Sequence, residues 1–313
     1  MDDWSEDIGR RFFGSFHLEK IPISHSRSPD CFITLRRDDP PSIFEVMRSF
    51  KVQRGICHSD GDRLILEVDG SVIFIDSELP GNATVWFGSS DHARRPGLIE
   101  NVLSYLLPAA LRRCRLYEIH AAGVVEPDSG TGFLLIGESS SGKSSLTVRL
   151  AGSGWKYLSD DMVVVNATNA DVEAIALRRV FSVSPSSIAP CELPRLAEAL
   201  GRTVRSHPDK RRLEPSIVFP GKFIETCSPR VLCFLSIEDR EESRLLPISH
   251  SAAMIRLMKH CAWSCYDESG AHTFIETLGK LVRQTRCYTL SSGRDILAQP
   301  SLSAKILGEA VCN

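Results

Sequence analysis

The stretch GFLLIGESSSGKSS (132–145) decides how the chain folds. Its first residues are apolar and predict a buried strand, and the residues from Lys143 to about Ala151 predict a helix. Glycines, serines and one lysine lie between these two elements. A strand, a glycine-containing loop and a helix in this order are typical of a loop that binds phosphate. A serine- and glycine-rich linker is the alternative, and the apolar elements on both sides disfavour it.

The loop GESSSGKS (137–144) fits the pattern G-x-x-x-x-G-K-[ST]. Glycines at both ends let the backbone turn tightly around a phosphate, and the N–H groups at the start of the next helix point at the anion. Lys143 supplies a positive charge for the β- and γ-phosphates, and the Ser144 hydroxyl is a ligand for Mg²⁺. The residues expected to bind ATP or another nucleoside triphosphate are Gly137, Glu138, Ser139, Ser140, Ser141, Gly142, Lys143, Ser144 and Ser145.

Composition excludes several classes of protein. The 313 residues suffice for one large domain or two smaller ones, and the net charge of −2 gives no overall basic field for nucleic acid or anionic membranes. No apolar run is long enough to span a bilayer, and the acidic start MDDWSEDIGRR (1–11) does not resemble a signal peptide. The ten cysteines form no C-x-x-C pair, which favours reduced thiols in a cytoplasmic protein over a zinc site.

Residues 1–95 are expected to form a small β-rich domain with a structural or docking role. The segment 63–76 predicts two strands joined by a tight turn at Asp69-Gly70, and residues 31–37 and 83–88 predict further strands. Residues 94–114 have apolar side chains at helical spacing, with Pro108 expected to kink or split the helix.

Residues 96–313 are expected to form the larger, catalytic domain. Strands are predicted in 116–126, 156–166, 230–238 and 287–292, and helices in 251–266, 271–285 and 301–311. The basic segment SHPDKRRLEPS (206–216) is expected to be a loop. Strands that alternate with helices around the glycine-lysine loop predict an α/β or α+β fold.

Two aspartates follow the loop at a distance that suits phosphoryl transfer. Asp160 comes 17 residues after Lys143, which leaves room for a helix, a turn and a strand that runs back beside the first. The carboxylates of Asp160 and Asp161 would then face the γ-phosphate, one near Mg²⁺ and the other as acceptor of a proton from an attacking hydroxyl. An acidic surface turn is the alternative. His120, among apolar neighbours, would be able to hydrogen-bond Asp160 and tune that carboxylate.

These motifs resemble the HPr kinase/phosphorylase family. The resemblance rests on His120 with Gly123 nearby, on GESSSGKSS (137–145) and on SDD (159–161), and it covers residues 117–165. It implies a P-loop core of the kind found in phosphoenolpyruvate carboxykinase and HPr kinase, with ATP and Mg²⁺ as cofactors and a serine hydroxyl as acceptor. It also implies Asp160 as base supported by His120, and Asp161 with Ser144 as metal ligands, the division between the two aspartates being open.

Within this resemblance, the nearest overall build is that of the lasso-peptide kinases, which have a β-rich N-terminal portion before the kinase core. Those proteins phosphorylate the C-terminal serine of a precursor peptide. Ala121 and Ala122 stand between His120 and Gly123, which departs from the family's histidine-glycine pair. An HPr-type carrier protein as substrate, a small-molecule substrate, and a nucleotide-binding switch without an acceptor remain alternatives. Self-association is left open.

Two further groups of cations are candidates for contact with phosphate or substrate. A mobile cation would stabilise the charge that develops on the γ-phosphate. Solvated basic loops are the alternative. The residues are Lys210, Arg211 and Arg212 in one group, and Arg178 and Arg179 in the other.

Overall fold

The computed structural model describes residues 32–40, 48–52, 55–60, 63–75, 82–88, 97–168, 170–178, 180–204, 207–261 and 268–312. The chain divides into two compact units. Among the described residues, the N-terminal unit contains those up to Glu118 and residues 268–276, and the C-terminal unit contains the others. The division follows Glu118, whereas the sequence analysis placed it near residue 95.

The N-terminal unit is built on one antiparallel sheet with a parallel edge. Asp69 and Gly70 have φ angles of 49° and 81°, the left-handed values of the tight hairpin turn predicted there. Val68 pairs with Ser71 across that turn, so the two predicted strands are confirmed. The sheet order is β1 (Ile33–Arg36), β6 (Ala83–Trp86), β5 (Ser71–Ile75), β4 (Leu64–Val68), β3 (Gly55–Ser59) and β2 (Arg48–Val52).

Helix α3 (Leu98–Arg113) packs against β4 and β5 of this sheet. Pro108 was predicted to kink or split this helix, and the helix is not split, since Pro108 lies inside one continuous element. Leu106, Ala109 and Ala110 on either side of the proline are buried. Their burial stabilises the helix against the loss of one backbone hydrogen bond.

The C-terminal unit is built on a mixed sheet. Strands β9, β17 and β19 are parallel, and β8 is antiparallel to both β9 and β10. β10 therefore lies beside β8. The prediction that this strand runs beside β9 is wrong. The sheet order is β10 (Lys156–Ser159), β8 (Ala121–Val125), β9 (Gly132–Ile136), β17 (Pro229–Ile237), β19 (Arg286–Ser292) and β18 (Arg244–Pro247).

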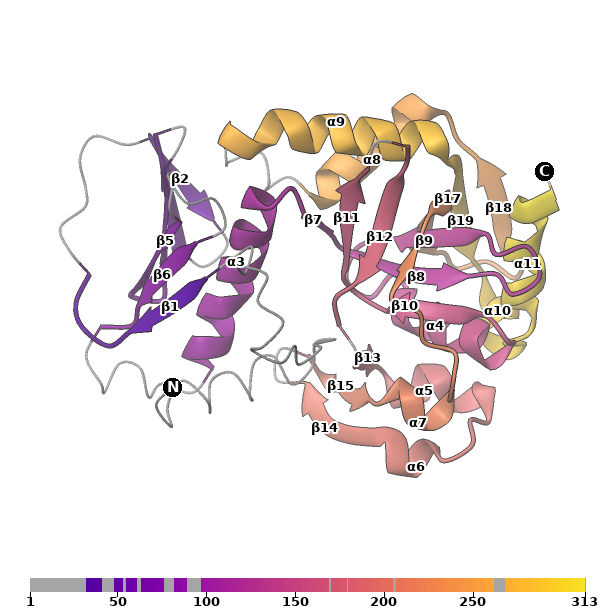
Figure 1. Ribbon diagram of the computed structural model, residues 1–313. Coiled ribbons are helices and arrows are strands. Elements are labelled where there is room, and N and C mark those ends of the chain that lie inside the picture. The colour runs from indigo at the N-terminus through magenta and orange to yellow at the C-terminus, as the bar shows by residue number, and fades with distance from the viewer. Residues whose placement is uncertain are drawn as a thin grey trace, which may run out of the picture. The chain divides into compact units, whose positions relative to one another are not determined.

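Helices cover this sheet (Figure 1). Helix α4 (Lys143–Gly152) follows β9 and packs against β8 and β10, while α8 (His250–His260) contacts β19. α10 (Arg294–Ala298) packs against α11 (Leu302–Cys312), which contacts α4. α9 (Glu268–Gln284) begins in the N-terminal unit and ends in the C-terminal unit. The helices predicted in 251–266, 271–285 and 301–311 are present as α8, α9 and α11. Residues 262–267 lie outside the described residues.

Smaller sheets and short helices complete the C-terminal unit. The predicted strand 116–126 is broken at His120 into β7 (Tyr117–Ile119) and β8. The remaining strands are β11 (Val163–Ala167), β12 (Val172–Ala176), β16 (Thr226–Cys227), β13 (Phe181–Val183), β15 (His207–Leu213) and β14 (Leu200–Val204). The short helices are α5 (Pro185–Ile188), η1 (Ala189–Cys191), α6 (Leu196–Ala199) and α7 (Pro215–Val218).

One of these strands corrects a prediction. The basic segment expected as a loop forms β15, which pairs with β13 on one side and β14 on the other. A strand that is paired on both sides satisfies its backbone hydrogen bonds whatever its side chains are. Pairing therefore overrides the polar sequence, and the cations of this segment sit on a sheet.

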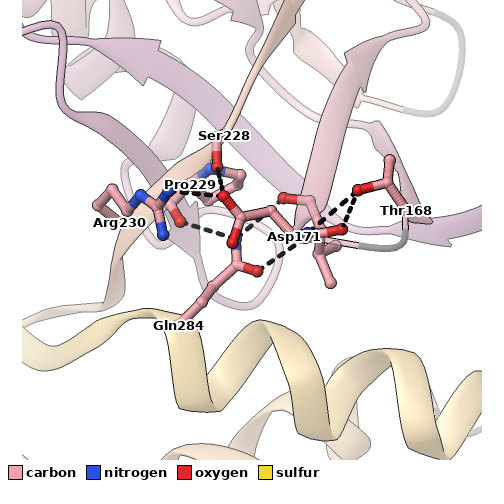
Figure 2. A network of polar contacts seen from close by, with 7 residues as sticks. Thr168, Asp171, Ser228, Pro229, Arg230 and Gln284 are labelled. Atoms are coloured by element: carbon pink, nitrogen blue, oxygen red, sulfur yellow. Dashed lines mark hydrogen bonds and ion pairs between the residues drawn. The ribbon is translucent and has the colours of Figure 1, made fainter.

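A hydrogen-bond network around Asp171 joins three segments of the C-terminal unit (Figure 2). The Asp171 carboxylate accepts hydrogen bonds from Arg230 Nη2 at 2.6 Å and from Ser228 Oγ at 3.3 Å. The Gln284 side chain, at the end of α9, accepts from the Val172 N–H at 2.7 Å and donates to the carbonyls of Val172 and Pro229. The network ties the turn before β12 to β17 and to α9.

The described cysteines have free thiols, among them the buried Cys57, Cys233, Cys261 and Cys287. No helix in the described part of the chain is long and apolar enough to cross a membrane. Sheets and helices of both units together make a mixed α/β fold.

Candidate active site

The loop between β9 and α4 has the conformation of an anion cradle. Ser140 and Gly142 adopt left-handed backbone angles, with φ of 65° and 94°. A Cβ atom at Gly137 would collide with the Ser141 side chain and lie 3.1 Å from the Leu235 carbonyl oxygen, so only glycine fits there. Gly142, the residue that caps α4, has no side chain to occupy the free N–H groups of the first turn. The helix dipole and these N–H groups favour a bound anion.

Lys143 is held over this loop. Its side chain is 5% exposed, and its ammonium group donates to the carbonyl oxygens of Gly137 at 2.7 Å and Glu138 at 2.9 Å. Burial lowers the pKa of Lys143, an effect that the charge of Asp161 opposes. The Ser141 hydroxyl is buried and has no hydrogen-bond partner among the described residues. A cation and an unpaired hydroxyl at the same loop fit an anionic ligand.

Asp160 is buried behind the loop. It is 1% exposed, and its carboxylate accepts a hydrogen bond from the Ser182 N–H at 2.9 Å and interacts with the Ser144 hydroxyl. Burial, and next the charge of Asp161, raise the pKa of Asp160 to about 6. A carboxylate that is buried beside a second carboxylate is costly to ionise unless a cation lies near it.

Asp161 turns in a different direction and meets His120. The His120 Nδ1 atom lies 3.3 Å from one carboxylate oxygen of Asp161, and Arg178 Nη1 lies 3.3 Å from the other. Burial lowers the pKa of His120, with Asp161 acting in the opposite direction. The histidine therefore pairs with Asp161, whereas the sequence predicted a hydrogen bond to Asp160. Both aspartates follow the end of β10, and their carboxylates have different partners, Ser182 and Ser144 for one and His120 and Arg178 for the other.

The side chains of Lys143, Asp161, His120 and Arg178 line a hollow of about 360 Å³, which we call the first hollow. Several predicted residues come together in it from distant parts of the sequence. The rest of its wall contains Arg149, Asp209, apolar side chains and serine hydroxyls, among them Leu146, Ser184, Ser187, Val204, Ile296 and Leu297. The predicted residues are His120, Ser139, Ser140, Ser141, Gly142, Lys143, Ser144, Ser145, Asp161, Arg178 and Lys210.

Four predicted residues line neither the described wall of this hollow nor that of the second one described below, or cannot be placed. Arg211 and Arg212 are two of them, and the Arg211 guanidinium donates to the carbonyls of Leu200 and Gly201 on β14. Side chains alternate along β15, so Lys210 faces the first hollow while Arg211 faces away. Asp160 is covered by the residues around it and does not line the described wall of either hollow. Arg179 lies outside the described residues.

A second hollow, of about 580 Å³, lies on the part of the loop next to α8. It shares Ser139, Ser140, Ser141, Leu235 and Ile237 with the first hollow. Its other lining residues are Ile136, Gly137, Glu138, Phe234, Ser236, Arg256, Lys259 and His260. The second hollow is thus basic on its α8 side.

Sequence reasoning missed two features of these hollows. Arg149 lines the first hollow although it is 3% exposed, and it donates to the Ser187 carbonyl at 2.8 Å. A charge on the apolar face of a predicted helix was the signal for it. The α8 residues of the second hollow carry no such signal, because more than 100 residues separate them from the loop.

The oxygen atoms near Ser144 fit a magnesium ion. Among the described residues there is no cluster of three or more His, Cys, Asp and Glu side chains that could hold a metal. Mg²⁺ does not need one, since it is usually held by one or two carboxylates, phosphate oxygens and water. The Ser144 hydroxyl and the Asp160 carboxylate, whose pKa is raised, supply part of such a set of oxygen ligands.

Comparison with known proteins identifies no family for this chain. No protein-family model matches the chain, and no curated protein matches it. Among solved structures, the chain is similar to the Hpr(Ser) kinase/phosphatase from Coxiella burnetii, with 11% identity over 62% of this chain and 90% of that chain. The TM-score is 0.32, and a value this low carries no argument about fold or activity.

Proposed function

We propose that the chain is an ATP- and Mg²⁺-dependent kinase that phosphorylates a serine hydroxyl of a peptide or protein. The observation that carries the proposal is the meeting of Lys143, Ser144 and the Asp161–His120 pair at one anion cradle. The C-terminal serine of a lasso precursor peptide is the proposed acceptor, on the sequence resemblance alone. Residues 1–95, expected from the sequence to form a structural or docking domain, would help to dock that acceptor.

In this proposal the nucleotide occupies the first hollow. The loop N–H groups and Lys143 bind the phosphates, and Arg178 and Lys210 lie in the same hollow to balance charge on the transferred group. Magnesium would neutralise charge on the phosphate oxygens when bound. The interaction between Ser144 and Asp160 supports Asp160 as the carboxylate nearest to the metal, which exchanges the roles that the resemblance implied.

Asp161 and His120 then serve the acceptor. The serine oxygen forms a bond to the γ-phosphorus while the bond from that phosphorus to the bridging oxygen of ADP breaks. The serine proton passes to Asp161, whose orientation is held by His120 and Arg178. Because burial lowers the pKa of His120, the imidazole is neutral and able to donate one hydrogen bond.

Transfer of label from γ-labelled ATP tests the function. The protein is incubated with Mg²⁺, labelled ATP and a peptide that ends in serine, beside the same peptide ending in alanine. We expect label on the serine peptide and none on the alanine peptide. Release of free phosphate with both peptides unlabelled would contradict a kinase and favour a nucleotide-binding switch. An HPr-type carrier protein and a set of metabolites serve as further acceptors.

A further inference from the structure

Three basic side chains of α8 face the second hollow. Arg256, Lys259 and His260 are spaced three and four residues apart, which places them on one side of a helix. Arg256 is fixed in position, since it donates to Thr289 Oγ1 at 2.7 Å and lies 5.9 Å from the centre of the Phe234 ring. This face belongs to α8, which neither the loop motif nor the aspartate pair includes.

The charges around the second hollow favour an anion. Its titratable lining residues are Arg256, Lys259, His260 and one acid, Glu138. The serine hydroxyls of the loop and of Ser236 add hydrogen-bond donors to the same wall. A planar guanidinium beside an ammonium group binds a carboxylate well, and nothing in this set is specific for a nucleobase.

The second hollow adjoins the position where the γ-phosphate would lie. Both hollows share Ser139, Ser140 and Ser141 of the loop, so a group in either one contacts the same cradle. The positive charge of Lys143 contributes to lowering the pKa of His260, after burial, so the two groups lie within electrostatic reach. In-line transfer requires the attacking and leaving oxygens on opposite sides of the phosphorus. With the nucleotide in the first hollow, the acceptor hydroxyl must reach Asp161 there, and the second hollow remains for a group next to that hydroxyl.

We propose that the second hollow binds the acceptor through a carboxylate next to the acceptor hydroxyl, so that the substrate is an acidic peptide held by Arg256 and Lys259. The inference rests on the proposed kinase function and assigns a substrate chemistry to it. The carboxylate has two sources, an acidic side chain beside the serine or the C-terminus of the peptide. Nucleotide binding by the loop does not depend on either source.

Peptides that differ in one carboxylate test the inference on the full chain. The parent peptide has Asp beside the serine and a free C-terminus; one variant replaces Asp with Asn, and another has a C-terminal amide. We expect a KM about 10-fold higher for whichever peptide lacks the carboxylate that is used. Equal KM values for all three peptides would overturn the proposal.

Charge reversal on α8 locates the site. Lys259→Glu should raise the KM for the parent peptide by about 10-fold and the KM for ATP by less than about 2-fold. The control is Lys305→Glu, which makes the same charge change at an exposed site on α11 outside both hollows. Where the Asn peptide is the one with the raised KM, a variant peptide with Lys in place of Asp should restore the KM of the Lys259→Glu protein. Arg256→Gln gives the same measurement with a smaller charge change should Lys259→Glu fold poorly.

The outcomes separate this inference from the function on which it rests. A higher KM for ATP in Lys259→Glu, with no change for the peptide, would show that the second hollow holds the nucleotide and would overturn the inference while leaving a kinase. No label on any peptide, with free phosphate released, would overturn the proposed function itself. Peptide affinity measured by fluorescence anisotropy, with a non-hydrolysable ATP analogue present, reads out the α8 contacts without turnover.

Discussion

The C-terminal unit contains two networks centred on aspartates, and they differ in how well their polar groups are paired. Around Asp171, the carboxylate pairs with Arg230 and Ser228, and the side chain of Gln284 has three backbone partners (Figure 2). Around Asp160, a buried carboxylate lies beside a second one and its pKa is raised to about 6. Asp160 and Asp171 are only eleven residues apart in the sequence.

The difference indicates that one network stabilises the fold and that the other is suited to binding or reaction. A polar network whose members are all paired stabilises one arrangement of segments, as the Asp171 network does for β12, β17 and α9. Buried like charges with perturbed pKa values lower stability and are retained where they bind or react. Substitutions in the two networks should therefore have opposite effects on stability and activity.

The largest effect is expected from Asp161→Asn. Loss of the proton acceptor should reduce kcat by about 1000-fold. The Kd for the nucleotide should stay within about 3-fold, because the loop and Lys143 are intact. Single-turnover transfer measured beside nucleotide titration checks both values. Wild-type kcat in this variant would remove Asp161 from the reaction.

Asp160→Asn should stabilise the free protein at high pH. Because the pKa of Asp160 is raised from 3.8 to about 6 on folding, the folded state holds the proton more tightly, and the free energy of unfolding falls as pH rises through this window. The variant removes up to about 3 kcal/mol of this cost at pH 8 and little at pH 4. Denaturant unfolding at several pH values measures it.

Asp171→Asn is the matched control for that change, and it should lower the free energy of unfolding at pH 8 by about 1 kcal/mol, since it weakens a satisfied, partly exposed ion pair. Stabilisation by both substitutions, or by neither, would contradict the contrast between the networks. Magnesium with nucleotide should stabilise the wild type at pH 8 more than the Asp160→Asn protein, because only the wild type presents the Asp160 carboxylate to the cation.

Lys143→Ala should weaken nucleotide binding. Removing one charged contact to the phosphates is expected to raise the Kd by about 10- to 100-fold. The side chain also bonds two loop carbonyls, so Lys143→Arg serves as a control that keeps the charge. Calorimetric titration with ATP checks the prediction, and an unchanged Kd in Lys143→Ala would show that the nucleotide binds elsewhere.

Gln284→Ala in the Asp171 network is expected to affect stability alone. Three backbone groups lose a partner that is partly buried, which should cost about 1–2 kcal/mol of unfolding free energy. The kcat of the folded protein should not change, because Gln284 touches no residue of either hollow's described lining. A drop in kcat at full folding would mean that this network also supports the reaction.

Local patterns predicted the parts of this structure that depend on local sequence. The strand-loop-helix around Lys143 and the Asp69-Gly70 turn follow from apolar spacing and glycine chemistry, and both are present. The pairing between strands was not predicted. β15 is a strand because it is hydrogen-bonded to β13 and β14, and β10 pairs with β8. The side chosen by each aspartate, and the approach of α8 to the loop, depend on contacts between segments far apart in the sequence.

A crystal structure of the protein with Mg²⁺ and a non-hydrolysable ATP analogue would show whether the loop around Lys143 binds the nucleotide. We predict that the β- and γ-phosphates lie on the N–H groups of residues 138–145, with the cation at Ser144 and Asp160 and the Asp161–His120 pair facing the γ-phosphate. Phosphates bound away from this loop, or an Asp161 turned away from them, would contradict the account.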